Sequence, residues 1–163
     1  MNTAAEQRLQ SLPLRALVVA PVRIVLALAG VAAAIAAGAP RPGALLAFLT
    51  AAVGLVVVVV ADPRRYIFRI PDDPPDAEPE AIEDGVARLA LAAVFPSTAG
   101  VTVLLLAALA FEPTLSAMLA GIIAGLGVAA LVYGVDQLLA ERRTGLRLFL
   151  VRGTQQVVAR RMP

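Results

Sequence analysis

The chain has 163 residues, of which 60% are hydrophobic, carries a formal net charge of +2, and contains no Cys, His, Lys or Trp. Soluble domains average about 45–50% apolar residues, so this chain could not bury so much apolar surface in water. The missing Cys and His exclude disulfides, thiolate chemistry, imidazole catalysis and the usual zinc and haem sites. We therefore expect an integral membrane protein with no cofactor and no metal.

Four apolar runs follow one another along the chain, and each is close to the ~20 residues that cross a bilayer as a helix. Lipid offers the backbone no hydrogen-bond partners, so a single spanning segment must be helical. The runs cover residues 21–39, 43–61, 89–111 and 115–139, and the first could begin at Leu14. The expected fold class is an all-α integral membrane protein with four transmembrane helices.

Short links at residues 40–42 and at Glu112 and Pro113 join the runs into two antiparallel hairpins. The sequence thus divides into five parts: an N-terminal cytoplasmic or interfacial segment (1–20), transmembrane hairpin 1 (21–61), a cytoplasmic basic-then-acidic Pro-rich loop (62–88), transmembrane hairpin 2 (89–140) and a C-terminal basic amphipathic tail (141–163). Aligning Pro42 with Pro113 also aligns several identical residues, which leaves a weak internal repeat and chance similarity both open.

The arginines predict the orientation in the membrane. Of the arginines outside the apolar runs, Arg41 alone lies on one side, and the others lie on the side of the termini and the long loop. The positive-inside rule therefore predicts that both termini are cytoplasmic. All basic residues are arginine, which indicates a GC-rich bacterial genome and hence a bacterial plasma membrane. The arginines flank apolar runs, so lipid explains them better than nucleic acid does.

The N-terminal segment predicts a short interfacial helix that ends at Pro13. The first run resembles a signal peptide in outline, but Pro40 directly follows the would-be cleavage site and three more runs follow, which favours a retained helix. Arg23 lies inside this run, and we expect it near the cytoplasmic end, where its side chain can reach the headgroups.

The long loop begins basic and becomes acidic. Its first arginines, Arg64, Arg65 and Arg69, are expected to bind lipid headgroups. Acids from Asp72 to Asp84 alternate with prolines, which predicts an exposed, extended chain without regular helix. Two interpretations stay open: a mobile cytoplasmic connector, or a docking strip for a basic partner.

Beyond the fourth run, arginines alternate with apolar residues. Arg142, Arg143 and Arg147 are predicted to bind headgroups of the anionic inner leaflet. The tail itself is expected to form an amphipathic interfacial segment, with an extension of the last helix as the alternative.

Small residues four apart form flat strips where two helix backbones can approach closely. One strip comprises Ala117, Gly121 and Gly125, and the other comprises Gly30, Ala34 and Gly38. Such strips serve packing within the monomer or a seam with another subunit, and both remain open.

Polar residues within the runs are few. Pro96, Thr98, Thr102 and Asp136 form the candidate polar site. Proline kinks a helix and nearby hydroxyls satisfy the freed backbone groups, which fits a static kink or a binding site. Asp136 suits an interfacial salt bridge or, alternatively, ion handling.

No catalytic residue is assigned, and we do not expect an enzyme. The sequence favours a structural or accessory subunit of a membrane complex. Its expected partners are anionic inner-leaflet lipids and another membrane subunit or a second copy of the chain. An oligomeric transporter or channel is the alternative, and a membrane enzyme acting on lipids is the weakest possibility.

Overall fold

The computed structural model describes residues 8–61, 75–77, 82–83, 85, 97–151 and 157–161. Four helices make up most of these residues. They are α1 (Leu12–Ala36), α2 (Arg41–Ala61), α4 (Ser97–Phe111) and α5 (Pro113–Thr144). Four strands complete the described part of the chain: β1 (Arg8–Ser11), β2 (Ile82–Glu83), β3 (Leu146–Val151) and β4 (Val157–Arg161).

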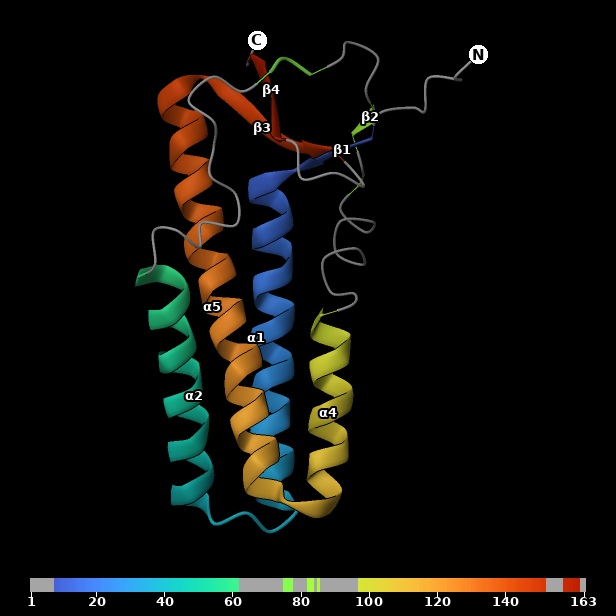
Figure 1. Cartoon of the computed structure of the whole chain (residues 1–163), viewed down its shortest axis with the longest axis vertical. Coiled ribbons are helices and arrows are strands. Elements are labelled where there is room, and N and C mark those ends of the chain that lie inside the picture. The colour runs from blue at the N-terminus through green and yellow to red at the C-terminus, as the bar shows by residue number, and fades with distance from the viewer. Residues whose placement is uncertain are drawn as a thin grey trace.

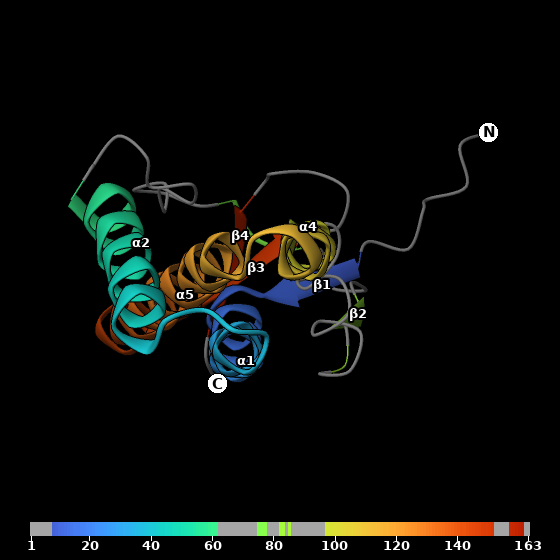
Figure 2. The ribbon, with the colours of Figure 1, turned by 90° about the horizontal axis from the view of Figure 1, so that it is seen from below.

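The four helices run up and down, with α1 antiparallel to α2 and α4 antiparallel to α5 (Figure 1). Their packing does not follow the order of the chain. Helix α5 lies at the centre and contacts α1, α2 and α4, whereas α1 and α2 barely contact each other (Figure 2). The first two helices therefore form a hairpin by connection, while α5 supplies most of the packing surface for both.

Three helices, α1, α2 and α5, are long and apolar enough to cross a membrane. The described part of α4 has 15 residues, which is shorter than the ~20 residues that a bilayer requires. The mostly helical fold and its membrane-embedded character therefore agree with the sequence. The fourth span and the internal repeat stay predictions.

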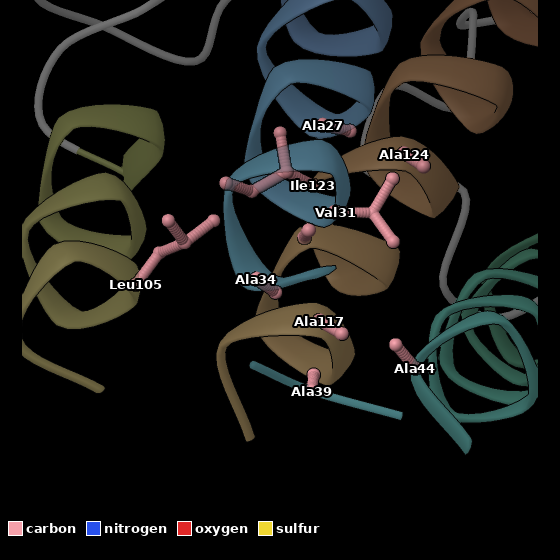
Figure 3. Close-up of a cluster of buried hydrophobic side chains, with 10 residues drawn as sticks. Ala27, Val31, Ala34, Ala39, Ala44, Leu105, Ala117, Ile123 and Ala124 are labelled. Carbon is pink, nitrogen blue, oxygen red and sulfur yellow. The ribbon is translucent and has the colours of Figure 1, made fainter. Parts of the chain in front are cut away.

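The centre of the bundle is built from small side chains. Buried residues from all four helices form one cluster, shown in Figure 3: Ala27, Val31, Ala34, Ala39, Ala44, Leu105, Ala117, Ala120, Ile123 and Ala124. Large apolar side chains point outward instead, and Leu46, Val25 and Val103 are about two-thirds exposed. This distribution is typical of helices in lipid, where close backbone packing replaces the hydrophobic drive of water.

Helix α1 begins at Leu12, nine residues before Pro21 and two before the alternative predicted start at Leu14, and it continues through Pro21. It ends in a Schellman motif, in which Gly38 and Ala39 donate to the carbonyls of Ile35 and Ala34 at 3.1 and 3.0 Å. Gly38 has a φ of 105°, a left-handed conformation that L side chains rarely adopt. Gly38 therefore ends a helix, rather than continuing the packing strip that the sequence predicts.

A four-stranded sheet lies at the end of the bundle where α1 begins and α5 ends (Figure 1). The strand order is β2-β1-β3-β4, and β1 pairs parallel with β2 and antiparallel with β3. The sequence predicts an all-α chain with an N-terminal interfacial helix, and both expectations are wrong for residues 8–11, which are a strand. The last helix extends past residue 139 to Thr144, and the tail beyond it forms β3 and β4.

Both faces of this sheet are buried. Leu148 and Leu150 of β3 belong to one apolar cluster with Leu12, and Phe149 and Val151 belong to another with Leu9. Alternate residues of β3 thus point to opposite faces, as a strand requires. The composition of a six-residue apolar run of this kind fits either a helix or a strand. The pairing of β3 with β1 and β4 makes it a strand.

The long loop contributes to both edges of the sheet. Ile82–Glu83 pairs with β1 at one edge. At the other, Ala77 donates to the carbonyl of Ala159 at 2.8 Å, and Ala159 donates to the carbonyl of Pro75 at 2.9 Å. These residues are extended, as the sequence predicts, and they pair with the sheet. Residues 62–74, 78–81, 84 and 86–96 lie outside the described part of the chain.

Candidate functional site: an arginine held between three helices

Arg23 lies in the middle of α1 and carries a positive charge into the apolar bundle. It is eleven residues from the start of the helix at Leu12, a distance of roughly 16 Å along the axis. Its side chain is partly buried. The structure shows the Arg23 side chain bonded within the bundle, and its depth relative to the headgroups stays a prediction.

The guanidinium of Arg23 connects three helices. Its Nε donates to Thr98 Oγ1 on α4 at 2.8 Å, and one terminal nitrogen lies 3.5 Å from the carbonyl oxygen of Leu126 on α5. Thr98 is only 1% exposed. The hydroxyl of Thr102 donates to the carbonyl of Thr98, four residues earlier in α4, at 2.7 Å. The structure thus brings two predicted residues, Thr98 and Thr102, together around Arg23.

Two glycines on α5 allow α1 to come close enough for these bonds. A Cβ on Gly127 would lie 3.1 Å from Arg23 Cβ and 3.2 Å from the carbonyl oxygen of Ala20. A Cβ on Gly134 would lie 2.9 Å from Leu17 Cγ. The sequence prediction missed both glycines. Their seven-residue spacing, which places them on one face of a helix, is a signal that could have revealed them.

The predicted GxxxG pair faces a different helix. A Cβ on Gly121 would overlap the carbonyl oxygen of Phe48 on α2, and a Cβ on Gly125 would lie 2.8 Å from the carbonyl oxygen of Ala52. Ala117 is fully buried in the same central cluster. Helix α5 therefore presents one glycine face to α2 and another to α1.

The second predicted strip is only partly a packing surface. A Cβ on Gly30 would lie 2.8 Å from Leu105 Cδ1 and 3.1 Å from Ala120 Cβ, and Ala34 is fully buried. A Cβ on Gly38 would meet nothing within 4 Å. Gly30 and Ala34 thus lie at helix contacts, whereas Gly38 serves the turn.

The remaining predicted residues lie elsewhere. Asp136 is exposed on α5, apart from Arg23 and Thr98. Arg142, Arg143 and Arg147 are exposed at the end of the bundle that carries the sheet. The other four predicted residues, Pro96, Arg64, Arg65 and Arg69, are outside the described residues.

Further polar side chains also join elements. Ser116 Oγ donates to the carbonyl of Leu105 at 3.1 Å, and the Tyr133 hydroxyl donates to the carbonyl of Val59 at 3.0 Å. Glu141 Oε1 accepts the N–H of Leu148 at 2.7 Å and so connects α5 to β3. Within the described residues, the buried Gln137 Oε1 has no hydrogen-bond partner.

This arrangement can do two things chemically. A guanidinium fixed by a hydroxyl and a carbonyl can hold three helices in register, and it can also attract an anion into the span. Among the described residues there is no group of three Asp or Glu side chains that could hold a metal ion. Comparison of the chain with protein-family models, with curated proteins and with solved structures finds no match.

Proposed function

We propose that this chain is a multi-pass membrane protein that acts as a structural or accessory subunit of a membrane complex. The observation that carries the proposal is how the bundle uses its polar side chains. Arg23, Ser116 and Tyr133 each bond to a neighbouring helix, and two of the three bonds end on backbone carbonyls. Such bonds fix helix positions, which suits a static scaffold.

The outer surface offers room for a partner. Helix α2 packs against α5 along one side, while Leu46, Leu49 and Val53 expose 55–68% of their surface on the rest of the helix. In the bilayer this apolar face contacts lipid, another subunit or a second copy of the chain. We propose that it is the face where the complex forms.

The proposed topology has four spans and both termini in the cytoplasm of a bacterium. The sheet supports an even number of crossings, because β1 precedes all helices and β3 follows them, yet the two strands pair. Three crossings would leave these strands on opposite sides of the membrane. The arginines near the sheet, including Arg142 and Arg143, support the cytoplasmic assignment of that end.

Two experiments test the proposal. Reporter fusions at residues 40–42 and 112–113 should report an external location, and external labelling of either terminus would refute the topology. Photo-crosslinkers at Leu46 and Val53 should give one discrete product in native membranes, whereas a crosslinker at Val25 on α1 serves as the matched lipid-facing control. Identical diffuse labelling of lipid at all three positions would contradict an accessory subunit that docks through α2.

A second candidate function, an oligomeric transporter or channel, is favoured by Arg23 itself. A guanidinium held at depth beside the hydroxyl of Thr98 offers a site for an anionic solute. Purified protein in liposomes would then mediate an anion flux that Arg23→Gln abolishes and that the exposed-residue change Arg143→Gln leaves unchanged. The absence of any flux for the unmodified protein would rule this function out for the chain alone.

A further inference from the structure

A pocket of about 290 Å³ lies where the helical bundle meets the sheet. The first residues of α1, the last turns of α5 and strand β3 line it. Leu17, Leu138 and Phe149 contribute apolar surface, and Ser11, Glu141 and Arg147 contribute polar groups. The pocket is therefore amphipathic, and the apolar spans end beside it.

Glu141 is the most unusual residue of the pocket. It is only 7% exposed, although a buried carboxylate is costly unless several donors surround it. Its Oε1 accepts the Leu148 N–H at 2.7 Å. A carboxylate can accept about four hydrogen bonds, and the described residues record no donor for its other oxygen. The pocket thus presents a carboxylate that has spare acceptor capacity.

Arg147 provides the opposite charge in the same pocket. It is exposed, in contrast to Glu141. A guanidinium binds phosphate through several N–H donors, and a carboxylate accepts from an ammonium. The two side chains together match a ligand that carries a phosphate and a protonated amine a few bonds apart.

We propose that this pocket binds the headgroup of a phospholipid that carries both a phosphodiester and a primary ammonium. Arg147 contacts the phosphate, and Glu141 accepts a hydrogen bond from the ammonium. The part of the acyl chain nearest the headgroup lies against Leu17 and Leu138. The proposal rests on the membrane topology proposed above, since that topology places the pocket at the level of the inner headgroups. It goes further by naming the lipid class and the residues that select it.

The test compares lipids on the purified, detergent-solubilised protein by native mass spectrometry. Phosphatidylethanolamine should bind at least about tenfold more tightly than phosphatidylcholine, whose methylated ammonium has no N–H to donate. Phosphatidylglycerol, which has the phosphate but no amine, should also bind more weakly. Equal affinity for the three lipids would overturn the proposal without any variant. The topology is measured separately by the fusions above, so the two failures can be distinguished.

Variants assign the two charges. Glu141→Gln keeps an acceptor for the Leu148 N–H and should abolish the preference for ethanolamine over choline. Arg147→Gln should weaken the binding of both phosphatidylethanolamine and phosphatidylcholine. The matched change at an exposed residue, Arg143→Gln, should leave the binding of both unchanged. An Arg147→Gln protein that binds like Arg143→Gln would overturn the phosphate assignment. If an equal concentration of soluble glycerophosphoethanolamine displaces the lipid, the pocket binds a soluble ligand. That result would overturn the proposal that it binds a lipid.

Discussion

Replacing Gly121 by alanine tests the packing of α5 against α2. The added methyl group would overlap the carbonyl oxygen of Phe48 and lie 3.0 Å from both the Phe48 carbonyl carbon and Ala51 Cβ. Ordinary van der Waals contact begins near 3.4 Å. The obstacle is mainly backbone, which cannot rotate away as a side chain could. The two helices must therefore move apart along the whole contact.

The expected loss of stability follows from two opposing effects. Overpacking of this kind costs about 1–3 kcal/mol, and the overlap with a backbone oxygen places Gly121→Ala near the upper value. Alanine regains up to about 1 kcal/mol through its higher helix propensity. The net destabilisation should be about 2 kcal/mol, or roughly thirtyfold in the ratio of folded to unfolded protein.

The assay is reversible unfolding in mixed micelles, combined with a spin-label distance between α2 and α5. Gly54→Ala is the matched control, because Gly54 also lies inside a helix and an added Cβ there meets nothing within 4 Å. It should leave stability unchanged or raised, and the distance unchanged. The reasoning is refuted if Gly121→Ala is as stable as Gly54→Ala and the α2–α5 distance stays the same.

Three other outcomes are expected. Thr98→Val removes the acceptor of Arg23 Nε while keeping the shape of the side chain, and should lower the free energy of unfolding by about 1–2 kcal/mol in the same assay. The control Thr50→Val, at an exposed residue, should leave stability unchanged, and equal stability of the two variants would contradict the role of the bond. Gly38→Ala places a side chain on a residue in the left-handed conformation and should lower the free energy of unfolding by about 1 kcal/mol. Gly43→Ala, at a helical position with open space, should not lower it. The Ala77 amide should exchange with solvent at least about tenfold more slowly than a free amide, and exchange at the free rate would show that this segment does not pair with Ala159.

The helices could be predicted from the sequence because each is a continuous apolar run, and in lipid such a run must satisfy its own backbone hydrogen bonds. An apolar run such as residues 43–61 must be helical in lipid, and the structure has α2 at Arg41–Ala61. The start of α1 was harder to predict. Its first turns, which include Arg15, are less apolar, and Pro21 resembles a helix start although it lies inside the helix.

The sheet could not be predicted because its pairings join distant parts of the chain. Gln10 pairs with Leu150, so nothing near β1 indicates that it is a strand. The same limitation applies to the site. The glycine pair Gly121 and Gly125 is visible at its four-residue spacing, but the bond from Arg23 to Thr98 spans 75 residues of chain. Only the folded arrangement reveals that Arg23 links α1 to α4 and α5.

The position of β1 constrains how the chain is made. β1 precedes every helix that the structure describes, yet its neighbour β3 is synthesised only after α5. The pairing of β1 with β3 therefore waits until α5 is complete, although β2 becomes available to β1 earlier. The β1–β3 pairing can therefore form only in a chain whose described helices have all been synthesised, and a chain that stops before the end of α5 lacks the central pair of the sheet.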